Sequence, residues 1–206
     1  MTLWQAAKMP ASATPAPALF LDRDGVVMRD QDYLGDPAGV EVLPGVAQAM
    51  KRARAAGYLL LGVSNQSGLD RGYFSPSDFD AVMKKLATDL REAGASFDGF
   101  YYCPHRPAAD CACRKPRTGL LDEAATRFNW IPERSWVIGD KFSDVELGWN
   151  AGLGSVLVRT GYGILAEASV RDRWPASERV LVADDLLAAV AMILTGPGDR
   201  GEGSPS

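Results

Sequence analysis

Cysteine and histidine are scarce in this chain, which has three cysteines and one histidine among 206 residues. Three cysteines are too few for the disulfide framework of a small secreted protein. Reduced thiols are expected instead, and these are typical of a cytoplasmic protein. The first residues also lack the apolar segment of a secretory signal peptide, which supports the same expectation.

Long apolar runs and an excess of positive charge are missing as well. No stretch of about 18 apolar residues occurs that could span a bilayer. Asp and Glu outnumber Lys and Arg by 26 to 22, which gives a net charge of −4. We therefore expect no membrane partner and no nucleic-acid partner. We also expect a monomer that holds any anionic ligand with a few local cations.

Short apolar runs alternate with helical patterns along most of the chain. The runs are nearly continuous, which is typical of strands buried on both faces of a parallel sheet. They lie at residues 18–21, 58–63, 99–102, 136–138, 155–158 and 180–182. Helix starts are indicated at Ser75 before Pro76, at Ser143 in a capping box with Glu146, and at Asp184. The pattern predicts an α/β fold, a Rossmann-like three-layer parallel sheet with helices on both faces.

The two ends of the chain depart from this alternation. Residues 1–17 are rich in alanine and proline, and residues 196–206 are rich in glycine, proline and serine. We expect a flexible N-terminal tail over residues 1–17, one domain over residues 18–195, and a disordered C-terminal tail over residues 196–206.

All cysteines and the histidine lie within residues 103–113. The four residues are Cys103, His105, Cys111 and Cys113. Four ligands at this spacing can close a tetrahedron around Zn²⁺ and leave no open position, so we expect a structural zinc. A chance group of free thiols is the alternative. Zinc at this loop excludes a Ser–His–Asp triad, because the single histidine is a ligand. We also expect the zinc to hold in position the cationic segment that begins at Arg114.

Carboxylates follow two of the expected strands. Asp22 and Asp24 follow residues 18–21, and Asp140 follows residues 136–138. Ligands of parallel sheets bind at the carboxyl ends of strands. Carboxylates that meet there repel one another unless a hard cation lies between them, and Mg²⁺ prefers carboxylates, water and a phosphate oxygen. The sequence therefore predicts a Mg²⁺ site at this edge, although Asp22 and Asp24 taken alone could also form a surface turn.

This predicted Mg²⁺ site suggests phosphoryl chemistry. With the cation bound, Asp22 can stay ionised and act as a nucleophile, and Asp24 can transfer protons. Ser64 follows the next strand, and Lys115 follows the zinc loop. The Ser64 hydroxyl and the Lys115 ammonium can stabilise the charge on a transferring phosphoryl group.

Four motifs resemble those of the haloacid dehalogenase superfamily, in the superfamily's order. They are residues 20–27, residues 64–65, Lys115 and residues 139–144. Within the superfamily, the chain is most similar to the D-glycero-D-manno-heptose 1,7-bisphosphate phosphatases. The stretches that carry this similarity are residues 22–25, 64–68, 71–72, 101–105, 111–116 and 138–141. The histidinol-phosphate phosphatase branch shares the zinc loop, but typically has an aspartate where Ser67 stands.

The resemblance implies Mg²⁺-dependent hydrolysis of the C7 phosphate through an aspartyl-phosphate, in the synthesis of nucleotide-activated heptose for lipopolysaccharide. It implies that Asp22 attacks phosphorus, and that Asp24 protonates the leaving sugar oxygen and then activates water. It also implies that Mg²⁺ is held by Asp22, the main-chain carbonyl of Asp24 and Asp140, with Asp144 supporting the metal site from behind. The implied substrate contacts are Asp30, Gln31, Asp32, Tyr33, Asn65, Gln66, Ser67, Arg114 and Lys141.

Further implications concern the architecture and the alternatives. The branch has no large cap domain, so the zinc loop would shape the substrate entrance. Ser64 stands where a threonine is common, and both supply a hydroxyl. The linker between His105 and Cys111 is five residues long, a length similar to that in the histidinol branch. Histidinol-phosphate hydrolysis is therefore the nearest alternative. A phosphate-binding module without catalysis is the second.

Overall fold

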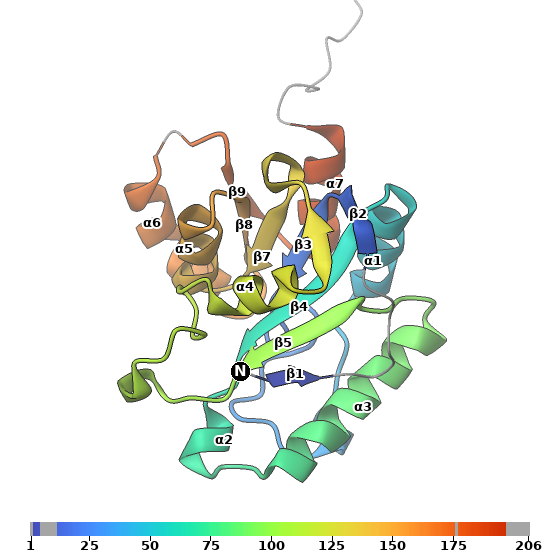
Figure 1. Ribbon diagram of the computed structural model, residues 1–206, viewed down its shortest axis with the longest axis vertical. Coiled ribbons are helices and arrows are strands. Elements are labelled where there is room, and N and C mark those ends of the chain that lie inside the picture. Colours follow the sequence, from blue (N-terminus) through green and yellow to red (C-terminus); the bar gives the residue numbers. More distant parts are fainter. Residues whose placement is uncertain (1, 5–11, 176, 197–206) are drawn as a thin grey trace, which may run out of the picture.

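A sheet of seven strands forms the centre of the computed structural model, which describes residues 2–4, 12–175 and 177–196 (Figure 1). The strands are β1 (Thr2–Trp4), β3 (Ala18–Leu21), β4 (Leu59–Asn65), β5 (Gly99–Cys103), β7 (Trp136–Gly139), β8 (Gly154–Val158) and β9 (Val180–Ala183). Their order is β1-β5-β4-β3-β7-β8-β9. Six of them are the strands expected from the apolar runs.

The strand order reverses between β3 and β7. From this pair, β4 and β5 extend to one side, β8 and β9 to the other, and all six strands are parallel. Asp22, which directly follows β3, donates its backbone N–H to the Ile138 carbonyl of β7 at 3.0 Å. Such a reversal leaves a crevice at the carboxyl ends of the strands, where ligands bind in open α/β sheets.

Helices cover both faces of the sheet. They are α1 (Val46–Ala55), α2 (Gly68–Arg71), α3 (Pro76–Glu92), α4 (Gly119–Ala125), α5 (Phe142–Asn150), α6 (Gly163–Arg173) and α7 (Leu186–Thr195). Leu19 and Leu21 of β3 pack in one core cluster with α1, α3 and α7, whereas Phe20 packs in the other with α4 and α5. Helix α6 packs on the α5 side through Val170. The predicted three-layer fold is confirmed.

The N-terminal segment contains two strands that the expected flexible tail over residues 1–17 does not anticipate. Strand β1 pairs antiparallel with β5, and β2 (Ser12–Ala16) pairs parallel with β6 (Phe128–Trp130) in a second, small sheet. Both strands depend on distant partners, so the local sequence carries little signal for them. The expected C-terminal tail lies, from residue 197 onward, outside the described residues.

The helix starts follow the prediction at α3 and shift by two residues at α5 and by one residue at α7. Ser75 and Asp78 form the expected reciprocal cap of α3. The prediction of Ser143 with Glu146 is wrong, because α5 already begins at Phe142 and Asp144 Oδ2 accepts the Lys141 N–H at 3.0 Å. Asp185 caps α7, not Asp184, whose carboxylate pairs with Arg159 instead.

The connections between the first strands are short. Between β3 and β4 lie only a 3₁₀ turn, η1 (Pro37–Gly39), and α1, and between β4 and β5 lie α2 and α3. Two further 3₁₀ turns, η2 (Pro107–Ala109) and η3 (Pro132–Arg134), lie later in the chain. As expected, neither the connection from β3 to β4 nor the connection from β4 to β5 forms a folded cap. None of the helices in the described part of the chain is long and apolar enough to cross a membrane.

Candidate active site

Three carboxylates meet where the strand order reverses. Asp22 follows β3, Asp140 follows β7 and Asp144 lies in the first turn of α5. Each offers an oxygen within 4.8 Å of the other two, and all three side chains are buried. Asp140 Oδ1 has no hydrogen-bond partner among the described residues. Burial, and then the charge of Asp22, raise the pKa of Asp140 to about 7. Buried carboxylate oxygens that face one another, one of them without a hydrogen-bond partner, are ligands that fit Mg²⁺.

Lys115 is buried among the same groups. Its Nζ lies 3.1 Å from Asp22 Oδ1 and 2.6 Å from Asp144 Oδ1, and donates to the Val63 carbonyl at 2.8 Å. Burial opposes ionisation of Asp22, but Lys115, Lys141 and further hydrogen bonds outweigh it, so the pKa of Asp22 is lowered. Burial also opposes the charge of Lys115, yet the two carboxylates raise its pKa. Asp22 is therefore an ionised carboxylate beside a fixed cation, as a nucleophile requires.

Asn65 holds the backbone of Lys115. Its Nδ2 donates to the Lys115 carbonyl at 3.2 Å, and its Oδ1 accepts the Lys115 N–H at 3.0 Å. Asn65 also lines the cleft, as expected of a substrate contact. Its side-chain amide, however, is engaged in fixing the position of the lysine.

Asp24 is turned toward Arg23 and Gln66. Arg23 Nε and Nη2 donate to the two Asp24 carboxylate oxygens at 3.0 and 2.9 Å. Gln66 Nε2 donates to Asp24 Oδ2 at 2.8 Å and to Ser64 Oγ at 2.9 Å. A primary amide has two N–H donors, and both donors of Gln66 are used here. Gln66, predicted as a substrate contact, thus has no free donor for a substrate.

A cleft of about 280 Å³ opens above these groups. The predicted site residues that line it are Asp22, Asp24, Asp30, Asp32, Tyr33, Asn65, Gln66, Ser67, Arg114, Lys115 and Lys141. Gln31 is not among the lining residues, because its amide turns away and donates to the Gly39 carbonyl at 2.7 Å. Arg23, Ser143 and Tyr162 line the cleft and were not predicted.

Tyr162 connects one side of the cleft to the carboxylates. Its N–H donates to Asp140 Oδ2 at 2.8 Å, and its hydroxyl donates to Asp32 Oδ1 at 3.2 Å. The Lys141 ammonium lies 4.9 Å from the centre of the Tyr162 ring and 3.2 Å from Asp30 Oδ2. A signal for Tyr162 was available, because it follows strand β8, which ends at the same edge of the sheet.

Two glycines allow the backbone to approach Asp140. Gly25 and Gly161 have φ values of +77° and +58°, in the left-handed region that favours glycine. A Cβ atom on either residue would collide with the Asp140 carboxylate. Both positions therefore require glycine for steric and conformational reasons.

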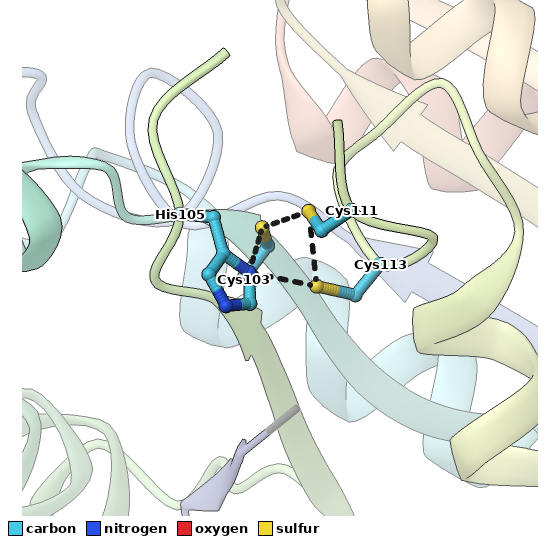
Figure 2. Close-up of side chains that lie close together, drawn as sticks. All are labelled: Cys103, His105, Cys111 and Cys113. Carbon is cyan, nitrogen blue, oxygen red and sulfur yellow. Dashed lines mark hydrogen bonds between the residues drawn. The ribbon is translucent and has the colours of Figure 1, made fainter. Parts of the chain in front are cut away.

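The four predicted zinc ligands form a compact cluster (Figure 2). Cys103 Sγ lies 3.5 Å from Cys111 Sγ and 3.6 Å from His105 Nδ1. Cys113 Sγ lies 3.4 Å from Cys111 Sγ and 3.3 Å from His105 Nδ1. Zn–S and Zn–N bonds of about 2.3 and 2.0 Å in a tetrahedron place ligand atoms roughly 3.5–3.8 Å apart. The donor set and its spacing fit Zn²⁺, with no ligand position left open.

The cysteine–histidine cluster is joined to the cleft through the backbone. Cys103 ends β5, and its carbonyl accepts the Gln66 N–H at 2.7 Å. Arg114 follows Cys113, lines the cleft, and donates from Nη1 to the His105 carbonyl at 3.2 Å. A metal in the cluster would thus order the segment that carries Arg114 and Lys115.

The sequence of this chain is similar to those of known phosphatases. A family model described as HAD-hydrolase-like matches residues 112–189. Over 193 residues, the chain is 40% identical to a D-glycero-D-manno-heptose-1,7-bisphosphate 7-phosphatase of Thermosynechococcus vestitus, a match that covers 88% of this chain and 97% of the relative. A D-glycero-beta-D-manno-heptose-1,7-bisphosphate 7-phosphatase of Helicobacter pylori is 42% identical over 135 residues, which are 65% of this chain and 78% of the relative.

A solved structure has the same fold. It is the D,D-heptose 1,7-bisphosphate phosphatase of B. bronchiseptica, complexed with magnesium and phosphate. It is 33% identical in sequence, has a TM-score of 0.78, and the match covers 87% of this chain and 98% of that one.

Proposed function

Because this chain belongs to the haloacid dehalogenase-like family of D-glycero-D-manno-heptose-1,7-bisphosphate 7-phosphatases, we propose that it hydrolyses the C7 phosphate ester of that sugar bisphosphate. The observation that carries the proposal is the ionised Asp22 beside the buried Lys115, with Asp140 within reach of a shared cation. The product feeds the synthesis of nucleotide-activated heptose for lipopolysaccharide or a related surface glycan.

In the first step, a carboxylate oxygen of Asp22 attacks phosphorus in line with the ester bond. The bond between phosphorus and the C7 oxygen breaks, and Asp24 gives its proton to that oxygen as the sugar leaves. Ser64 and Lys115 hold the phosphoryl oxygens, because both lie beside Asp22. The step leaves a phosphate bound covalently to Asp22.

In the second step, Asp24 takes a proton from a water molecule whose oxygen attacks phosphorus. The bond between phosphorus and Asp22 breaks, inorganic phosphate leaves and the Asp22 carboxylate is restored. Asp22, Asp140 and the main-chain carbonyl of Asp24 are the groups that would hold Mg²⁺. When bound, the ion supplies positive charge to the phosphoryl oxygens and to the facing carboxylates.

The cleft also suits the remainder of a sugar bisphosphate. Arg114 and Lys141 are cations on its wall, and they can hold the second phosphate group. Asp30 and Asp32 also line the cleft, where their carboxylates can accept hydrogen bonds from sugar hydroxyls. Burial opposes the charge of Lys141, but Asp22, Asp140 and Asp30 raise its pKa, so it carries a positive charge near neutral pH.

The wider setting belongs to the same proposal. We infer one catalytic domain over residues 18–195, a monomer in the cytoplasm, and no nucleic-acid or membrane partner. The net charge of −4 supports the absence of a nucleic-acid partner. The three cysteines, which form no disulfide and group as metal ligands, support a reducing compartment.

A substrate comparison tests this function. The kcat/KM values for both anomers of the heptose bisphosphate and for histidinol phosphate are measured with saturating Mg²⁺ and with a chelator. We expect a preference of about 100-fold or more for a heptose bisphosphate, since the cleft offers cations for a second phosphate. A preference for histidinol phosphate would overturn the substrate, and no turnover of any phosphoester would favour a binding module.

A further inference from the structure

Arg23 is a charged residue buried next to the active site. It is 1% exposed and is the largest fully buried side chain among the described residues. Its guanidinium lies 5.7 Å from the centre of the Phe79 ring, and Nη1 lies 3.7 Å from the Met83 sulfur. A buried guanidinium is costly unless it is paired with an anion and hydrogen-bonded. The carboxylate that pairs with it is Asp24, at 2.9 Å.

The geometry of this pair fixes the Asp24 carboxylate. Arg23 uses Nε for one oxygen and Nη2 for the other, a two-point contact that sets the plane of the carboxylate. Gln66 adds a third hydrogen bond to Oδ2, and its own Oε1 accepts from Arg23 Nη2 at 3.0 Å. Asp24 is thus held by two buried side chains that also hold each other.

We propose that Arg23, with Gln66 as its bridge, is a positioning residue that aims Asp24 at the oxygen of the leaving sugar. This inference rests on the proposed function, in which Asp24 transfers the proton. A carboxyl group transfers a proton efficiently only within hydrogen-bond reach and in the right orientation. The three hydrogen bonds use one lone pair of Oδ1 and both of Oδ2, which leaves one lone-pair site on Oδ1 to serve first the leaving oxygen and then water.

Arg23 is separate from the groups that drive nucleophilic attack. Among the described residues, no hydrogen bond joins the Arg23 side chain to Asp22, Ser64 or Lys115. Its loss should therefore slow the steps that need Asp24 and spare the attack by Asp22. A general defect of the fold would slow both.

The leaving group separates these two cases. A sugar alcohol is a poor leaving group, so cleavage of its phosphate ester needs a proton from Asp24. The phenolate of p-nitrophenyl phosphate and the acetate of acetyl phosphate leave without protonation. With these two activated substrates, attack by Asp22 still forms one equivalent of aspartyl-phosphate when Asp24 is misplaced, and only the later attack by water is slow.

The experiment compares Arg23→Lys with the wild-type enzyme in the presence of Mg²⁺. Lysine keeps the charge but cannot make the two-point contact. Sugar release from the heptose bisphosphate is followed in a single turnover. The initial burst of leaving-group release, which accompanies formation of aspartyl-phosphate, is followed with whichever of the two activated substrates the wild type cleaves faster. We expect sugar release to slow by about 10- to 100-fold, part of the contribution usual for a general acid, and the burst rate to change by less than about threefold.

Met83→Leu is the matched control, since it changes another contact of the guanidinium and leaves its contact with Asp24 in place. Both rates of this variant should equal those of the wild type. If thermal unfolding shows that Arg23→Lys does not fold, Arg23→Gln, which also cannot make the two-point contact with Asp24, undergoes the same comparison.

The positioning role would be overturned if a folded variant slowed sugar release and the burst with the activated substrate equally. It would also be overturned if sugar release were not slowed. These outcomes differ from a failure of the proposed function, in which the wild-type enzyme itself would cleave no phosphoester.

Discussion

The two clusters of metal-ligating side chains in this protein are built in opposite ways. One continuous segment, which begins at the last residue of β5, supplies Cys103, His105, Cys111 and Cys113. Asp22 and Asp140 come from the ends of β3 and β7, which are far apart in the chain and adjacent in the sheet. The sheet therefore creates the carboxylate cluster, whereas the cysteine–histidine cluster orders its own loop.

The two clusters also differ in their charge balance. Lys115 and Lys141 compensate part of the carboxylate charge, and Asp140 keeps a raised pKa in spite of them. In the cysteine–histidine cluster, burial raises the pKa of Cys103 and Cys113. Burial also opposes the thiolate of Cys111, but contacts with Cys113 and Cys103 outweigh it and lower its pKa to about 7. Zinc binding here must release protons, because thiolates are the ligands.

Asp22→Asn should have the largest effect on activity. We expect kcat to fall by about 10⁴-fold or more, because the nucleophile is lost. The zinc content should not change, since the cysteine–histidine cluster does not share a ligand with the carboxylates. Phosphate release and elemental analysis measure the two outcomes. Asp172→Asn, at an exposed position on α6, is the control for an unrelated loss of charge.

Residual activity of Asp22→Asn above about 1% would contradict the nucleophilic role, since removing a nucleophile normally costs far more. Loss of zinc from this variant would show that the two clusters are coupled more tightly than their geometry implies.

The double variant Cys111→Ser, Cys113→Ser should have an intermediate effect. We expect kcat/KM for the sugar bisphosphate to fall by about 10- to 100-fold, because Arg114 and Lys115 lose the loop that orders them. The apparent affinity for Mg²⁺ should stay close to that of the wild type. Removing zinc from the wild type with a chelator and adding it back is the control. Full activity without bound zinc would show that the loop is ordered by other contacts.

The smallest predicted effect is the pH dependence of Mg²⁺ binding. With a pKa of about 7, Asp140 takes up a proton as the pH falls through 7, and the proton competes with the cation. Asp22, whose pKa is lowered, stays ionised over the same range. The apparent Kd for Mg²⁺ should therefore rise by about tenfold between pH 8 and pH 6, as measured by calorimetry. A constant Kd over this range would contradict the expectation that Asp140 is a ligand whose pKa lies near 7.

The same contrast explains what could be predicted from the sequence. The strands were predictable because residues buried on both faces of a sheet form continuous apolar runs, as at 18–21. The zinc ligands were predictable because they are close together in the chain. Strands β1 and β2 were not, since they depend on the edges of β5 and β6 and have little pattern of their own.

The direction of individual side chains was the part that the sequence could not supply. Gln31 and Gln66 were predicted as substrate contacts because the family resemblance assigns residues 30–33 and 65–67 to the substrate. One turns to the Gly39 carbonyl, and the other gives both donors to Asp24 and Ser64. Arg23 lies between Asp22 and Asp24 in the sequence, yet its burial follows only from its packing against Phe79 and Met83.

The position of β3 next to β7 has a consequence for the order of events during synthesis. The ribosome makes Asp22 early and Asp140 only after α4, β6 and the whole cysteine–histidine segment have been added. A nascent chain that ends before β7 already has every thiol and the imidazole, but it lacks a second carboxylate to share a cation with Asp22. The carboxylate cluster therefore cannot assemble before β7, in the middle of the sheet, has been made.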